Sequence, residues 1–283
     1  MAFFKGFYFK QQNRDEVVAL IPAIHSDGNV EKSASIQILT RENSYFVPYR
    51  AEEVGLYDQA GAIAIGSSVF TKNAVYLHMN SQDVLASGEL HFSGMTPLAY
   101  DIMGPFKLMP NLECRHMILS MRHNVRGNLV INGNHYVFCD GIGYLEGDRG
   151  RSFPQTYFWC HCAETNPSCS ISIAVAKVPV AGIELEGVIA VVQIGEKEYR
   201  LATYLGARVY SGRHFVLLKQ GNRRLKVEFG KLFGQELHAP VAGQMTLRIR
   251  EGICCEASFL FAEGENCLLD FTTQRASIER VLS

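Results

Sequence analysis

Apolar and polar residues alternate with a period of two along much of this chain, and this pattern constrains the fold more than any other feature. In an extended strand, successive side chains point to opposite faces, so the alternation buries one face and exposes the other. Apolar residues at the spacing of an amphipathic helix are scarce. The sequence therefore predicts an all-β protein with few, short helices.

The clearest single unit runs from Gly127 to Phe138. Two strand-like runs flank the dipeptide Asn132-Gly133, which accepts the positive φ angles of a type I′ hairpin turn. Similar turn residues recur at Asp27-Gly28, Gly195-Glu196, Gly221-Asn222 and Gly264-Glu265. Short strands punctuated in this way are typical of β-sandwiches and β-barrels.

The length of 283 residues is enough for one large domain or two ordinary ones, and a hydrophobic content of 47% excludes disorder, collagen and coiled coil. Residues 163–170 are polar and rich in turn formers, which makes them the best candidate for a junction. We expect a β domain over 1–165 and a second over 166–283.

The charge and hydropathy of the chain limit the kinds of partner that it can bind. The chain carries 27 basic and 28 acidic side chains, without a basic run longer than Arg223-Arg224, so we expect no nucleic-acid partner. Lys5 and Lys10 interrupt the aromatic start, which excludes a signal-peptide core, and no window is long and apolar enough for an integral membrane segment. We therefore expect a cytoplasmic protein; the oligomeric state stays open.

The eight cysteines are expected to be reduced, because the chain is long and lacks a secretory signal. Cys160, Cys162 and Cys169 with His161 form the cluster that most resembles a metal site, but their spacing is not the paired spacing of structural zinc sites. Core packing explains them better, so we expect no metal.

Three stretches are dense in residues that can react or bind: 113–116, 140–154 and 155–162. If these segments are strands, Tyr144 and Glu146 share one face, and Tyr157, Trp159 and His161 share another. A carboxyl group held among aromatic side chains is a suitable general acid, and aromatic faces stabilise a developing cation.

Simpler structural roles exist for the same residues. Glu146 and Asp148 beside Arg149 and Arg151 are, by themselves, more often a solvated ion-pair loop than a catalytic pair. A lone Trp159 is more often a core anchor, and a lone His116 or His161 is more often a hydrogen-bonded structural histidine. Residue type and spacing alone therefore leave an all-β protein without a named activity.

The chain resembles the tocopherol cyclase family, a group of lipocalin-like proteins related in fold to carotenoid hydratases and lipocalin-like pericyclases. The matching segments are Lys5-Gly-Phe-Tyr-Phe-Lys10, Met103-Gly-Pro-Phe106, Met109-Pro110 with Glu113-Cys-Arg-His116, and most specifically Gly143-Tyr-Leu-Glu-Gly-Asp-Arg-Gly-Arg-Ser-Phe-Pro154 with Tyr157-Phe-Trp159. Weaker matches follow at 202–207, 239–245 and 276–279. The resemblance implies two lipocalin-like, calycin-type β-barrel or sandwich domains side by side.

The chain also departs from that family's pattern. Arg149 stands where the family has Trp, and His161 and Ala163 stand where it has Gln and Asn. An aromatic wall and two amides are thus exchanged, so we expect a retained pocket with a different substrate. Fold similarity does not by itself transfer chemistry.

The resemblance implies acid-dependent cyclisation of a prenylated hydroquinone, without a metal or organic cofactor. In that interpretation Glu146 is the acid, Asp148 is the second choice, and His116 or His161 orients or deprotonates the hydroxyl. The candidate ligand contacts are Tyr144, Tyr157, Trp159, Glu113 and Arg149. The alternatives are a non-catalytic carrier or sensor of a hydrophobic small molecule and, less favoured, a carbohydrate-binding sandwich with an exposed aromatic platform.

Overall fold

The computed structural model describes residues 1–283 except 29–31, 58–61, 110–111, 181–182 and 282–283. Strands hold 72% of the chain, and the described part contains three short 3-10 helices and no α-helix. These are η1 (Ala51–Glu53), η2 (Gly104–Leu108) and η3 (Thr203–Leu205). The all-β prediction with few, short helices is confirmed.

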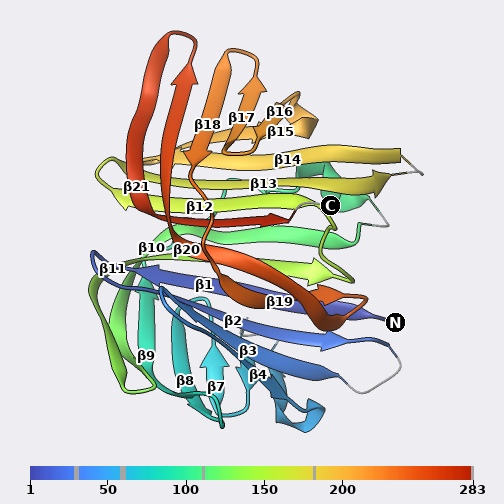
Figure 1. Cartoon of the computed structure of the whole chain (residues 1–283), viewed down its shortest axis with the longest axis vertical. Helices are drawn as coiled ribbons and strands as arrows, with labels where there is room; N and C mark the ends of the chain where they lie inside the picture. Colours follow the sequence, from blue (N-terminus) through green and yellow to red (C-terminus); the bar gives the residue numbers. More distant parts are fainter. Residues whose placement is uncertain (29–31, 58–61, 110–111, 181–182, 282–283) are drawn as a thin grey trace. The chain divides into compact units, whose positions relative to one another are not determined.

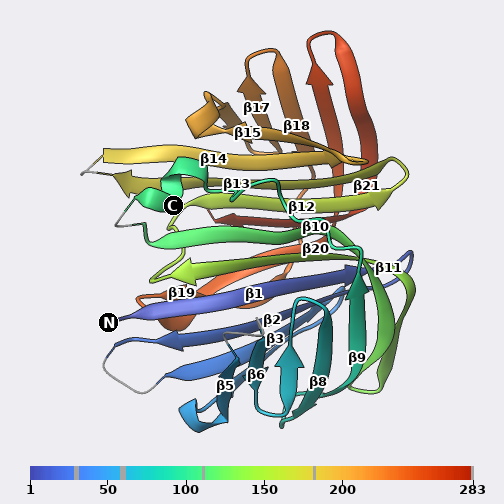
Figure 2. The same cartoon turned by 180° about the vertical axis from the view of Figure 1, so that it is seen from behind.

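The first sheet has eleven antiparallel strands in the order β4-β3-β2-β1-β11-β10-β9-β8-β7-β6-β5 and curls into a nearly closed barrel. Figure 1 draws it from blue to yellow-green, and Figure 2 shows β5, β6, β8 and β9 from behind. The strands are β1 (Phe3–Gln12), β2 (Val17–Ser26), β3 (Ser33–Thr40), β4 (Ser44–Tyr49), β5 (Val54–Tyr57), β6 (Ala62–Ile65), β7 (Ser68–Phe70), β8 (Ala74–Asn80), β9 (Leu85–Ser93), β10 (Cys114–Ile131) and β11 (Asn134–Gly150).

The second sheet has the order β15-β14-β13-β12-β21-β20-β18-β17-β16, and β19 pairs with β20. It also forms a nearly closed barrel. Its strands are β12 (Tyr157–Thr165), β13 (Ser168–Val180), β14 (Ile183–Ile194), β15 (Lys197–Ala202), β16 (Arg208–Gly212), β17 (Phe215–Gln220), β18 (Arg223–Phe229), β19 (Gln235–Val241), β20 (Gln244–Glu263) and β21 (Asn266–Val281).

The chain forms two compact units that interleave along the sequence. The first unit comprises Met1–Leu98, Glu113–Phe153 and Glu236–Arg248, and the second comprises Ala99–Leu112, Pro154–Gln235 and Ile249–Ser283. Segment 163–170 contains the turn that joins β12 to β13. The expected division into domains 1–165 and 166–283 stays a prediction.

Each unit buries one face of its strands as an apolar core. In the first unit, Phe9, Val125 and Leu145 belong to a cluster that extends over most strands of the barrel interior. In the second unit, Phe158, Cys160 and Cys162 belong to the corresponding cluster. The period-two alternation read from the sequence thus separates an inner apolar face from a second face that carries most of the candidate site residues.

The hairpin predicted at Asn132-Gly133 joins β10 to β11, the two strands that carry the cluster described below. Asn132 has φ 47° and Gly133 has φ 81°, as a type I′ turn requires. The Asn132 Oδ1 also accepts the Leu85 amide at 2.8 Å. The turns at Gly195, Gly221 and Gly264 likewise separate consecutive strands, whereas the segment after Gly28 lies outside the described residues.

Candidate functional site

Strand β11 places Tyr144, Glu146 and Asp148 on the face opposite the apolar core. Leu145, which alternates with them, belongs to that core. On one side, β1 sets Lys10 opposite Tyr144 and Tyr8 opposite Glu146. Tyr144 and Glu146 therefore share a face, as expected, and Asp148 lies on the same face.

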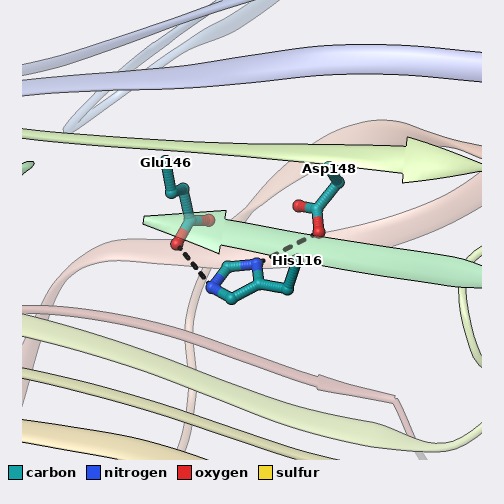
Figure 3. Close-up of side chains that lie close together, drawn as sticks. All are labelled: His116, Glu146 and Asp148. Carbon is teal, nitrogen blue, oxygen red and sulfur yellow. Dashed lines mark hydrogen bonds and ion pairs between the residues drawn. The ribbon is translucent and has the colours of Figure 1, made fainter. Parts of the chain in front are cut away.

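On the other side of β11, strand β10 places His116 directly opposite Asp148. The imidazole lies between two carboxyl groups (Figure 3). Its Nε2 is 3.4 Å from Glu146 Oε2, and its Nδ1 is 3.0 Å from Asp148 Oδ1. The side chains of His116 and Glu146 are 10% and 6% exposed, so the pair is largely removed from water. We call His116, Glu146 and Asp148 the acid–imidazole cluster.

Tyr144 extends this cluster at its buried end. Its hydroxyl donates a 2.5 Å hydrogen bond to Glu146 Oε2, the same oxygen that faces His116, and the Tyr144 side chain is 1% exposed. A phenol and an imidazole therefore both approach one carboxyl oxygen. Donors at this position stabilise the carboxylate that remains when Glu146 gives up a proton.

Cys114 meets the cluster at the Asp148 end. Its thiol donates a hydrogen bond to Asp148, with Sγ 3.5 Å from Oδ1. Burial and the negative charge of Asp148 raise the pKa of the Cys114 thiol well above its usual value. The thiol therefore stays protonated and acts as a weak donor to the carboxylate that holds His116.

The same three residues are the group in the described part of the chain whose potential metal-ligand atoms all lie within 4.8 Å of one another. However, each imidazole nitrogen faces a different carboxyl group. A shared ion would need one nitrogen and both carboxylates directed at a single point. The observed arrangement favours a hydrogen-bonded cluster that carries protons.

Tyr157, Trp159 and His161 lie on β12, in the second unit, and share one face as expected from their spacing. Trp159 and His161 have ring centroids 6.5 Å apart, and both side chains are buried. The Tyr157 hydroxyl donates to Glu279 Oε2 at 2.7 Å. The expected part of these three residues in the site stays a prediction.

The remaining expected residues are Arg149 and Glu113. Arg149 is exposed and follows Asp148, so it points to the opposite face of β11. Glu113 is half-buried, and its carbonyl oxygen accepts the Arg151 amide at 2.7 Å. The expected contacts of Arg149 and Glu113 with a ligand stay predictions.

Sequence reasoning missed some residues and found others for the right reason. Lys10 is 1% exposed and lies beside Tyr144, although the sequence did not single it out as a site residue. Glu279 and Glu251, directly opposite each other on β21 and β20, are also buried. By contrast, Cys160, Cys162 and Cys169 lie in the apolar core, as core packing predicts.

No protein-family model matches this chain, and no curated protein matches it. Solved structures do. CghA with Sch210972 has a TM-score of 0.61 at 9% identity over 100% of this chain and 89% of that chain. A protein provisionally described as AttH from Nitrosomonas europaea has 0.57 at 6% identity, over 99% and 93%.

Kievitone hydratase from Nectria haematococca has a TM-score of 0.52 at 12% identity, over 100% of this chain and 89% of that chain. At these identities the likeness shows the fold, which is lipocalin-like and extends over the whole chain. The expected fold is confirmed, whereas membership of the tocopherol cyclase family stays a prediction. Among the described residues, no helix has the length and apolar character needed to cross a membrane.

Proposed function

We propose that this chain binds a hydrophobic, prenylated or isoprenoid small molecule and catalyses its acid-dependent cyclisation, with Glu146 as the proton donor. One observation carries the proposal: Glu146 is buried, and its Oε2 faces both the Tyr144 hydroxyl and the His116 imidazole. An exposed carboxyl at this position would have favoured a solvated ion pair instead.

The surroundings of Glu146 suit an acid that must act repeatedly. Burial keeps water away from the Glu146 carboxyl, so solvent does not compete with the substrate alkene for its proton. After proton transfer, the Tyr144 and His116 donors stabilise the carboxylate. Both effects act in the direction that general acid catalysis needs.

The reaction can be written so that every proton is accounted for. The Glu146 O–H bond breaks and a C–H bond forms at one alkene carbon, which leaves a tertiary cation at the other. The phenol oxygen of the substrate then forms a C–O bond to that cation and releases its proton. We assign the return of this proton to Glu146 to His116, whose Nε2 lies 3.4 Å from Glu146 Oε2. The product is an isomer of the substrate, and this sequence uses no cofactor.

The structural neighbours support a small-molecule function without fixing it. One is named a hydratase, and another was solved with the compound Sch210972. Hydration and cyclisation both begin with protonation of an alkene or a related group, so a buried acid serves either. The choice of cyclisation rests on the resemblance of segment 143–159 to the tocopherol cyclase family.

A matched pair of variants tests the role of Glu146. Geranyl hydroquinone is incubated with wild type, Glu146→Gln and the control Glu89→Gln, whose side chain is 57% exposed in the native chain. We expect a chromanol from wild type and control, and turnover at least about 100-fold lower for Glu146→Gln, the usual scale for a lost general acid. Equilibrium dialysis should show similar binding for all three.

The alternative is a carrier of a hydrophobic small molecule. The pairing of Glu146 with His116 favours it, because an ion-paired acid can serve binding alone. In that case Glu146→Gln changes affinity for geranyl hydroquinone and no protein yields product. A carbohydrate-binding platform has less support, since Trp159 is 6% exposed rather than open to solvent.

A further inference from the structure

Gln11 and His123 are two polar side chains that lie on the core side of the first unit's barrel. Gln11 follows Phe9 at the strand period of two, and His123 precedes Val125 in the same way, so both point to the core side. Gln11 is 0% exposed and His123 is 2% exposed. Neither takes part in the acid–imidazole cluster, which lies on the opposite face of β11.

The strand register brings these two residues to one row of the sheet. Gln11 on β1 and His123 on β10 are both direct partners of Gly143 on β11. A side-chain carbon at Gly143 would lie 2.0 Å from His123 Nε2, so the imidazole occupies the space above this glycine. Gln11 and His123 therefore flank a single residue that has no side chain.

Three polar atoms in this row have no hydrogen-bond partner among the described residues: Gln11 Nε2, Gln11 Oε1 and His123 Nε2. A buried polar atom without a partner is less stable than a paired one, because it has lost its hydrogen bonds to water. Buried polar groups in folded proteins are nearly always paired, so an amide and an imidazole left in one apolar interior indicate a group that binds there.

The hydrogen bonds of Ser120 fix the form of His123. The Ser120 hydroxyl donates to the Arg122 carbonyl at 2.8 Å, and its oxygen lies 3.2 Å from His123 Nδ1. With its single proton directed to the carbonyl, Ser120 accepts from His123 Nδ1–H, and Nε2 presents a lone pair. Burial also lowers the pKa of His123 to about 4, which keeps the ring neutral.

Aromatic rings surround this polar pair. The Phe92 ring centroid is 4.8 Å from that of His123 and 6.1 Å from that of Phe9. Phe9 also packs against Phe70 at 5.8 Å. The row thus offers one acceptor, one amide and aromatic faces, with no charged side chain of its own.

We propose that the interior of the first unit binds a neutral hydroxylated aromatic molecule, whose hydroxyl donates to His123 Nε2 and accepts from Gln11 Nε2. A hydroxyl group can satisfy both atoms, because it is a donor and an acceptor at once. The site is separate from Glu146 and does not depend on the function proposed above.

Imidazole nitrogen resonances of the protein test this assignment with phenol and benzene as the two probes. We expect saturable shifts of the His123 resonances with phenol, and binding of benzene at least about tenfold weaker because it lacks the hydroxyl. The Gln11→Leu variant should weaken phenol binding by a similar factor. Glu146→Gln should leave it unchanged, which separates this site from the acid–imidazole cluster.

The proposal is overturned if His123 shows no saturable shift, or if benzene binds as tightly as phenol. It is also overturned if a long-lived internal water persists beside His123 at high phenol concentration, since the pair would then hold a structural water only. If Gln11→Leu does not fold, the comparison of phenol with benzene on the wild-type protein still decides the question.

Discussion

At the scale of single residues, Cys114 reports on the charge of the acid–imidazole cluster. Its raised pKa follows from burial and from Asp148, so iodoacetamide at pH 8.5 should alkylate it at least about tenfold more slowly than the exposed Cys139. Asp148→Asn removes a negative charge and should speed the labelling. Mass spectrometry of the labelled peptides measures both rates in one sample.

The raised pKa of Cys114 also makes the stability of the protein depend on pH. A thiol with a raised folded pKa contributes stability that is present below about pH 8.5, the unfolded value, and is lost as the pH rises through the folded pKa. Equal labelling of Cys114 and Cys139 would contradict the contact with Asp148.

His123 has the opposite dependence. Its pKa is lowered to about 4 by burial, so the unfolded chain binds a proton that the folded chain refuses between that value and about 6.5. The free energy of unfolding should therefore fall on acidification across this window, by an amount on the order of 3 kcal/mol. Urea unfolding from pH 7 to pH 4 measures it.

A comparison with two variants isolates this contribution. His123→Phe should lose part of the pH dependence, whereas the half-exposed His91 replaced by Gln should keep it. If His123→Phe and wild type lose stability equally on acidification, the buried neutral state of His123 is wrong.

At the scale of elements, we expect substitutions in two hairpin turns to change stability in opposite directions. Gly133 has φ 81°, and no atom lies within 4 Å of an added side-chain carbon. The change Gly133→Ala therefore introduces backbone strain without a steric clash. Ala242 already carries such strain, with φ 48°. We expect Gly133→Ala to lower stability by about 0.5–1 kcal/mol and Ala242→Gly to raise it by a similar amount.

The control for both is Gly230→Ala, a glycine without positive φ and without neighbours within 4 Å, which should change stability little. Urea midpoints at constant m-value measure all three. A loss of stability in Ala242→Gly would show that this turn is not strained.

The elements also show where sequence reasoning stops. Alternation placed Tyr144, Glu146 and Asp148 on one face, because that follows from local geometry alone. It did not pair His116 with Asp148, because the register between β10 and β11 passes through several β-bulges between 118 and 127. A bulge shifts the pairing by one residue and leaves no reliable trace in a single sequence.

At the scale of the whole molecule, the all-β class was predictable because strand period and turn residues agree along the chain. The interleaving of the two units was not. Segment 236–248 returns to the first unit from far along the chain, where the His238 amide donates to Gln37 Oε1 at 2.8 Å. Such long-range returns depend on side-chain contacts that composition and periodicity do not encode.

The proposed function assigns the proton that is added to the substrate to one residue, Glu146. That claim concerns a bond that is formed during the reaction and can be followed directly.

The most direct test is the reaction of geranyl hydroquinone in D₂O, with the product analysed by mass spectrometry. Protonation of the alkene by Glu146 predicts a chromanol with one non-exchangeable deuterium on carbon from wild type and from Glu89→Gln, and almost none from Glu146→Gln. A product without carbon-bound deuterium, or the same deuterated product at an undiminished rate from Glu146→Gln, would contradict the assignment of Glu146 as the acid.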